Sequence, residues 1–313
     1  LLGRINPEKL NAVKTTIALD DIKATFEHKL GAPLKLDAIE SAAAVIRVAN
    51  TKMAGAIRMV SLSLGADPRD FTLFAFGGAG PLHATALARE LGIPKVMVPC
   101  RPGITNALGC IVADLRHDFV NTINQPLDSA DIDEVHSIFA TQVAEGESLV
   151  RKEKTKISSI KRLFSVDMQF VGQTHLLRVP LESCSTSRAE LRTLFEEAYF
   201  KRFQVELAEI KANLVNINTS IIGVRSELDL TTLIDPDGRK SNVIDAKSGD
   251  RQVYFDNSWL QTPIYWRDRL PLKMELRGPA IIEQLDCTTV LEPTDIAYGD
   301  NDGNILITLG EIT

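Results

Sequence analysis

The feature that most constrains the fold is a strand that runs directly into a glycine-rich turn and then a helix. An apolar run from Phe71 to Phe76 is followed by Gly77-Gly78-Ala79-Gly80, and Pro81 then opens a helix. Glycine lets a backbone approach a ligand closely, and a helix N-terminus offers unpaired N–H groups at the positive end of its dipole. The run therefore predicts a turn that holds the phosphate or sugar end of a nucleotide.

A turn built only for packing explains the same glycines, because Gly-Gly-x-Gly by itself is a weak motif. The dinucleotide fingerprint Gly-x-Gly-x-x-Gly is incomplete: Gly78 and Gly80 fit it, but His83 stands where the third glycine belongs. No Gly-Lys-Ser/Thr follows the turn, so it is not a P-loop. A dinucleotide-dependent oxidoreductase is therefore a weak interpretation.

Composition excludes several classes of protein. The chain has 313 residues, enough for two domains, and its net charge of −6 without a basic block argues against nucleic acid as the main partner. It holds no apolar run of about 18 residues and no signal peptide at its start, so we expect a cytoplasmic protein with no membrane span. Four cysteines lack CxxC or metal-ligand spacing and are expected to be reduced thiols: Cys100, Cys110, Cys184 and Cys287.

The first third of the chain predicts an α/β unit. Asp37 and Glu40 form a capping box for a long helix whose apolar positions continue to Val60. The strand 71–76, a helix 81–91 and a strand 96–98 fit one βαβ crossover. A further helix is expected over 105–115.

Beyond residue 119 the pattern changes. A helix is expected within 130–155, and a hairpin of strands 164–170 and 176–180 turns at Gly172. Ser187 caps another helix, and a strand covers 215–221. The polar stretch 229–250 is expected to be a loop or linker. The last sixty residues are expected to form a small barrel or sandwich-like domain of short strands, over 253–255, 264–266, 280–283, 288–291 and 305–309.

No residue stands out as catalytic, and no metal site is predicted. We interpret His83 as a neutral, hydrogen-bonded histidine rather than a base. The charged cluster from Asp114 to Asp118 is interpreted as a solvated helix end. Glu283 follows three apolar residues, and without a visible partner we assign it a structural hydrogen-bonding role.

Several of these segments together resemble the hydantoinase A / oxoprolinase family. The most specific are Gly65-Ala66-Asp67-Pro68-Arg69-Asp70-Phe71 and the run from Phe76 through Gly-Gly-Ala-Gly-Pro-Leu-His to Ala84. Pro102-Gly103, Phe170-Val171-Gly172-Gln173 and the segment from Gly278 to Val290 continue the match over nearly the whole chain.

The resemblance implies an α/β fold that contains the second lobe of an actin-like (ribonuclease H-like) ATPase core, residues 1–118, followed by a β-rich α+β C-terminal domain, residues 119–313. It identifies Gly77, Gly78, Ala79, Gly80 and Pro81 as the turn on the adenosine side of an ATP site. The family's two phosphate loops, of the Asp-x-Gly-Gly-Thr kind, lie upstream of the Leu-Gly-Arg stretch that begins here at Leu2, and no such loop occurs in this chain. We therefore expect ATP and Mg as cofactors, with the Mg ligands on a missing N-terminal half.

The function that the resemblance implies is ATP-dependent hydrolysis of a small cyclic amide, and this chain would be the C-terminal part of the subunit, inactive alone. The expected partners are the missing N-terminal half and a hydantoinase B-type subunit or domain. Two alternatives stay open: a subunit of an ATP-dependent ketone carboxylase, and a non-catalytic assembly module that keeps the fold.

Overall fold

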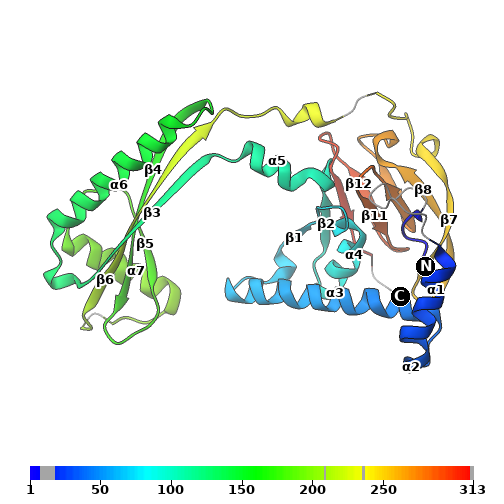
Figure 1. Cartoon of the computed structure of the whole chain (residues 1–313), viewed down its shortest axis with the longest axis horizontal. Helices are drawn as coiled ribbons and strands as arrows, with labels where there is room; N and C mark the ends of the chain where they lie inside the picture. Colours follow the sequence, from blue (N-terminus) through cyan, green and yellow to red (C-terminus); the bar gives the residue numbers. More distant parts are fainter. Residues whose placement is uncertain (8–17, 208, 235–236, 311–313) are drawn as a thin grey trace. The chain divides into compact units, whose positions relative to one another are not determined.

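The structure is a computed structural model that describes residues 1–7, 18–207, 209–234 and 237–310. The chain divides into two compact units, which Figure 1 shows. Unit 1 comprises Leu1–Gly109 and Asp229–Thr313, and unit 2 comprises Cys110–Leu228. Unit 1 is therefore built from both ends of the chain. The division after residue 118, which rests on the resemblance, stays a prediction.

The helices of unit 1 follow the capping signals of the sequence. The Asp37 carboxylate accepts the Glu40 N–H at 2.7 Å and the Glu40 carboxylate accepts the Asp37 N–H at 2.9 Å, so the predicted capping box is confirmed. Gly92, with φ of 71°, ends the helix that follows the glycine turn. The helices are α1 (Leu19–Phe26), α2 (Ala32–Leu34), α3 (Ala38–Ser63) and α4 (Gly80–Leu91), and α5 (Thr105–Val112) leads into unit 2.

Unit 1 contains two sheets. In the five-stranded sheet the order is β1-β2-β13-β12-β9, and β1 pairs parallel with β2, which confirms the predicted βαβ unit around α4. The four-stranded sheet has the order β11-β10-β8-β7. The strands are β1 (Thr72–Phe74), β2 (Lys95–Val98), β7 (Lys247–Phe255), β8 (Ser258–Trp266), β9 (Glu275–Arg277), β10 (Ala280–Glu283), β11 (Thr288–Leu291), β12 (Ile296–Gly299) and β13 (Ile305–Thr308).

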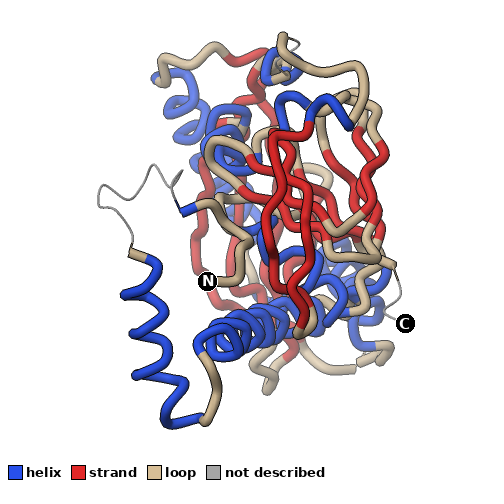
Figure 2. The backbone as a smooth tube through the Cα atoms, turned by 90° about the vertical axis from the view of Figure 1, so that its right-hand side faces the viewer, coloured by secondary structure: helices blue, strands red, loops and turns tan. Residues whose placement is uncertain are grey.

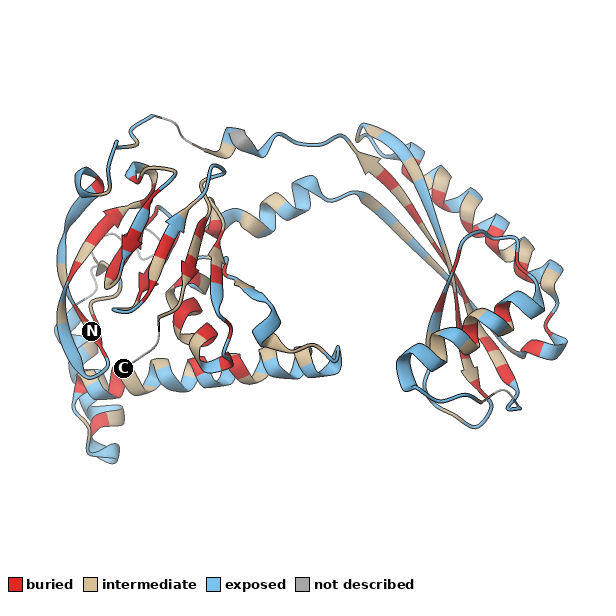
Figure 3. Cartoon of the chain, turned by 180° about the vertical axis from the view of Figure 1, so that it is seen from behind, coloured by how far each residue is buried: buried red, intermediate tan, exposed pale blue. Residues whose placement is uncertain are grey.

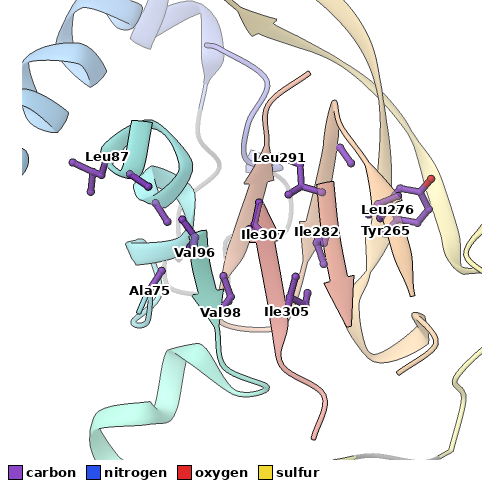
Figure 4. Close-up of a cluster of buried hydrophobic side chains, with 14 of the residues drawn as sticks. Ala75, Leu87, Val96, Val98, Tyr265, Leu276, Ile282, Leu291, Ile305 and Ile307 are labelled. Carbon is purple, nitrogen blue, oxygen red and sulfur yellow. The ribbon is translucent and has the colours of Figure 1, made fainter. Parts of the chain in front are cut away.

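The strands of the last sixty residues do not form a separate small domain, so that prediction is wrong. β13 pairs antiparallel with β2, placing Ile307 opposite Val96, and β12 and β9 follow it in the same sheet. Figure 4 shows the result: Val96 from β2, Ile307 from β13 and Leu87 from α4 belong to one hydrophobic cluster. The strands β9, β12 and β13 each bury only one or two residues, and the sequence does not show which other strand each one joins.

The long helix α3 lies at the lower end of unit 1 in both Figure 1 and Figure 2. Its buried Ala54 and partly buried Met53 and Ile57 pack against the core cluster that contains Leu87. Although α3 has 26 residues, no helix in the described ranges is both long and apolar enough to cross a membrane.

Unit 2 is a four-stranded antiparallel sheet with the order β3-β6-β4-β5. Its two helices share one core with the sheet, where Phe139 and Phe195 are buried together with Met168. The predicted hairpin is confirmed, and Gly172 follows its first strand with φ of 88°. The elements are β3 (Leu115–Pro126), α6 (Ile132–Lys152), β4 (Ile157–Phe170), β5 (Leu177–Leu181), α7 (Arg188–Phe203) and β6 (Ala212–Arg225).

Two sequence-based boundaries need correction. The helix expected over 105–115 ends at Val112, and the charged cluster lies on β3, where Arg116 and Asp118 form an exposed ion pair of 2.9 Å. The cluster is solvated as expected, but it lies on a strand because its polar residues alternate across a sheet with one open face. The polar stretch 229–250 is not all loop, since β7 begins at Lys247; residues 235–236 lie outside the described part.

Candidate functional site

The glycine turn lies between β1 and α4 at the carboxyl end of a parallel strand pair. Ala75 still donates its N–H to the Met97 carbonyl at 2.8 Å, and the chain then turns at Gly77, whose φ of 83° favours glycine. The Gly77 N–H donates to the Pro102 carbonyl at 2.7 Å. Gly78 and Ala79 are exposed, so a ligand can approach the backbone here.

The N-terminus of α4 adds hydrogen-bond donors to this turn. Ala79 occupies the N-cap position, and no side chain caps the helix. Pro81 is buried in the first turn, where its missing N–H costs nothing. An uncapped N-terminus of a 12-residue helix can donate backbone N–H groups to hydroxyl, phosphate or base acceptors of a ligand.

A third segment completes the surroundings of the turn. A Cβ built on Gly78 would lie 3.0 Å from the Asp286 carbonyl oxygen, and one on Gly103 would lie 2.0 Å from Oδ2 of Asp286. The side-chain amide of Gln284 donates to the Cys100 carbonyl at 3.1 Å, which ties this segment to the end of β2. The backbone carbonyl of Asp286, an acceptor, therefore lies beside the turn, and the carboxylate of this exposed residue lies against Gly103. Sequence reasoning missed Asp286, although it lies inside the segment that carries the resemblance.

His83 is hydrogen-bonded as expected. Its Nδ1 lies 2.8 Å from Oδ1 of Asn50 on α3, and burial, with a further contribution from Arg4, lowers the pKa of the imidazole. The neutral form is favoured, so His83 is better suited to holding α3 against α4 than to binding phosphate by charge.

Next to His83 a cavity of about 330 Å³ runs between the N-terminal segment, α3, α4 and the turn between β7 and β8. Arg4 lines it, and burial lowers the pKa of its guanidinium, whose buried Nε has no hydrogen-bond partner. Arg89 pairs with Asp295 at 2.8 Å and with Glu292 at 3.3 Å. Burial raises the pKa of Glu292 despite that pairing. The charges of this cavity are mixed, which suits a polar ligand with both donors and acceptors.

The remaining candidates have structural surroundings. The buried Glu283 forms an ion pair with Arg251, a partner that the sequence does not reveal. All four cysteines are free, and Cys287 is buried. Within the described ranges no three His, Cys, Asp or Glu residues gather in a way that could hold a metal ion.

The model of the hydantoinase/oxoprolinase family matches residues 1–119, and the model of the hydantoinase/oxoprolinase C-terminal domain matches residues 128–307. The chain is 33% identical over 310 residues to an uncharacterized protein of Methanocaldococcus jannaschii, covering 98% of this chain and 43% of that protein. It is 28% identical over 285 residues to the caprolactamase subunit alpha of Pseudomonas jessenii, covering 88% of this chain and 40% of the relative.

Two solved structures have the same fold. The ATP-dependent caprolactamase from Pseudomonas jessenii superposes with a TM-score of 0.76 at 25% identity, covering 99% of this chain and 46% of that chain. Nucleotide-free acetone carboxylase superposes with a TM-score of 0.75 at 20% identity, covering 98% and 45%. The mixed α/β fold with several sheets is therefore shared, and the chain spans less than half the length of each relative.

Proposed function

The chain belongs to the hydantoinase/oxoprolinase family, and on that basis we propose that it is the C-terminal part of a subunit of an ATP-dependent enzyme that hydrolyses a small cyclic amide. The observation that carries the proposal is the glycine turn: an exposed backbone next to an uncapped helix N-terminus, within the residues 1–119 that the family model matches. The similarity to an ATP-dependent caprolactamase supports the class of substrate.

In this proposal residues 77–81 form the adenosine side of the ATP site, on the second lobe of an actin-like core. The backbone N–H groups at the start of α4 donate to the nucleoside, and Asp286 beside Gly78 accepts from a ribose hydroxyl. ATP, when bound, supplies the phosphoryl group that activates the amide oxygen before water opens the ring. The residues that are present fit the nucleoside end of ATP, because the exposed turn offers both donors and an acceptor.

The phosphate end requires residues that this chain does not supply. Phosphoryl transfer depends on loops that hold the phosphates and on Mg²⁺ that neutralises their charge. The sequence contains no Asp-x-Gly-Gly-Thr loop. We therefore place the Mg ligands and both phosphate loops on a preceding N-terminal half, with a hydantoinase B-type subunit or domain as a further partner in the cytoplasm. The chain alone is expected not to hydrolyse ATP.

Titration calorimetry of ATP-Mg against the full-length subunit and its Gly78→Val variant tests the site. The added Cβ would meet the Asp286 carbonyl at 3.0 Å, so the turn or that carbonyl must give by a few tenths of an ångström, and ATP affinity should fall. Gly55→Val on α3, where a Cβ meets nothing within 4 Å, is the matched control and should bind ATP as the wild type does. Unchanged affinity in Gly78→Val would refute the assignment.

A second candidate, a subunit of a ketone carboxylase, is favoured by the fold shared with acetone carboxylase. Two assays of the full-length complex distinguish these functions: one measures turnover of cyclic amides, and the other measures bicarbonate-dependent turnover of ketones. The third, a non-catalytic assembly module, requires a reading frame that starts at Leu1, whereas an in-frame Asp-x-Gly-Gly-Thr sequence upstream supports the enzyme.

A further inference from the structure

The cavity of about 330 Å³ between α3 and α4 is separate from the glycine turn. On α4 its lining residues are Ala86, Arg89 and Glu90, and no residue of the range 77–81 lines it. Arg89 lies about 13 Å along the helix axis from Gly80, where α4 begins. The helix α3 forms a second wall, and Figure 3 shows the burial along this helix. The cavity is therefore distinct from the site that we propose for ATP.

Charged side chains of both signs line this cavity in equal numbers. They are Arg4, Arg47, Arg89, Glu90, Asp256 and Glu292. A nucleotide or another polyanion would meet three carboxylates here, and like charges repel. A ligand with one negative and one positive group meets a partner for each. The volume is at the lower end of the range for small-molecule sites, about 300–1,000 Å³, so the ligand is small.

The arginines of the cavity offer donors that lack an acceptor. The Nε atoms of Arg4 and Arg89 are both buried, and neither has a hydrogen-bond partner among the described residues. Arg89 is neutralised by Asp295 at 2.8 Å, whereas the Arg4 guanidinium carbon lies 5.7 Å from the ring centroid of Phe255. A guanidinium stays charged and its fork of N–H groups matches a carboxylate. A carboxylate is therefore the ligand group that satisfies Arg4.

Two carboxylates act on Arg4 across the cavity. Burial lowers the pKa of the Arg4 guanidinium, and the negative charges of Glu292 and Asp256 oppose that effect, so both lie near it. Glu292 is half-buried and pairs with Arg89 at 3.3 Å. Asp256 is exposed, in the two-residue turn between β7 and β8. An ammonium group that enters beside Arg4 therefore meets one carboxylate at the mouth of the cavity and another within it.

We propose that this cavity binds a small amino acid whose carboxylate meets Arg4 and whose ammonium group meets Asp256 and Glu292. The choice of ligand rests on the proposed function. Net hydrolysis of a cyclic amide breaks the C–N bond, adds the oxygen of water to the carbonyl carbon and places both protons of water on the nitrogen. The product carries a carboxylate at one end and an ammonium group at the other. The cavity thus holds the product of the reaction at a distance from the ATP site.

Titration calorimetry of the full-length subunit with three probes of equal chain length tests the proposal. The probes are ε-aminocaproate, which carries both charges, caproate, which lacks the ammonium group, and hexylamine, which lacks the carboxylate. The affinity for ε-aminocaproate should be at least about tenfold higher than for either of the others, because each charge finds its own partner. No binding of ε-aminocaproate, or equal binding of a probe with a single charge, would overturn the proposal.

Two variants locate the binding in the cavity. Arg4→Gln should weaken binding of ε-aminocaproate by at least about tenfold and leave binding of hexylamine unchanged. Asp256→Asn should lower the preference for ε-aminocaproate over caproate. Asp256 has φ of 40°, a conformation that asparagine tolerates, so the turn keeps its shape. Arg277→Gln, at an exposed position of β9, is the control and should bind ε-aminocaproate as the wild type does. Equal affinities of Arg4→Gln and Arg277→Gln would contradict the proposal.

Turnover assays separate failure of this proposal from failure of the proposed function. A full-length complex that hydrolyses cyclic amides with ATP but whose ε-aminocaproate binding is insensitive to Arg4→Gln refutes the cavity as the product site alone. A complex that binds ε-aminocaproate through Arg4 but hydrolyses no cyclic amide refutes the proposed function alone.

Discussion

Two glycines in helix interiors should respond in opposite ways to the same substitution. Gly146 lies in α6 of unit 2, where an added Cβ would be 2.4 Å from Cγ1 of Ile221 and 2.8 Å from Cε2 of Phe119. Gly55 lies in α3 of unit 1, where an added Cβ meets nothing within 4 Å. The pair separates helix propensity from packing, because alanine improves propensity equally at both positions.

The magnitudes follow from these distances. Alanine gains about 1 kcal/mol over glycine inside a helix. Overpacking a filled core costs about 1–3 kcal/mol, and we expect the upper end at Gly146 because Ile221 is fully buried and its Cγ1 cannot swing away. Gly146→Ala should thus lower the free energy of unfolding by about 1–2 kcal/mol net, and Gly55→Ala should raise it by up to about 1 kcal/mol.

Urea unfolding followed by two probes measures both effects. Both tryptophans of the chain, Trp259 and Trp266, lie on β8 in unit 1, so their fluorescence reports the unit that contains Gly55. Far-UV circular dichroism also follows unit 2. A Gly146→Ala variant more stable than the wild type would refute the packing argument, since stabilisation is what helix propensity alone predicts.

Two further predictions concern titrating groups. Burial raises the pKa of Glu292 in the folded chain above its ordinary 4.5, despite Arg89. The protonated side chain therefore contributes to the free energy of unfolding below pH 4.5, and this contribution is lost as the pH rises through the folded pKa. Glu292→Gln should therefore be more stable than the wild type at pH 7.5 and lose that advantage near pH 4.5. Urea unfolding midpoints of the two proteins at these pH values measure the difference, and a difference independent of pH would contradict the prediction. Burial raises the pKa of the Cys287 thiol to about 12, so at pH 8 a thiol reagent such as DTNB should modify the exposed Cys110 and Cys184 within minutes and Cys287 only after unfolding. Rapid modification of Cys287 in a variant that lacks the other three thiols, Cys100, Cys110 and Cys184, would contradict it.

Local features of the fold were predictable where the signal is local. The strands 280–283 and 288–291 match the prediction to the residue, because each is a short run rich in β-branched residues between turns. The strands β9 and β12 were missed, since each buries one side chain, Leu276 and Ala297, and so lacks a visible period. Pairing of β13 with β2 joins residues about two hundred positions apart, and no local pattern encodes such a partner.

The candidate site also has one part that local sequence predicts and one part that it does not. The turn at Gly77 could be found because its glycines and the following Pro81 are consecutive in the sequence. Asp286 and Arg4 could not be found, because only the fold joins them to their neighbours. Asp286 lies about two hundred positions from Gly78 and Gly103 in the sequence, and Arg4 lines a cavity together with residues of α3, α4 and the β7–β8 turn. The role of the turn in binding ATP stays a prediction.

Unit 1 is assembled from two separate segments of the chain, and this has a consequence for biosynthesis. A ribosome delivers residues 110–228, which are continuous, well before the chain is finished, so unit 2 can fold while synthesis continues. Unit 1 has to wait, because its central strand β13 ends at Thr308 and β2 stays without that partner until then. During this interval the apolar strands around residue 96 are exposed to aggregation, and a premature stop that removes only the last dozen residues would delete the middle of the sheet rather than its margin.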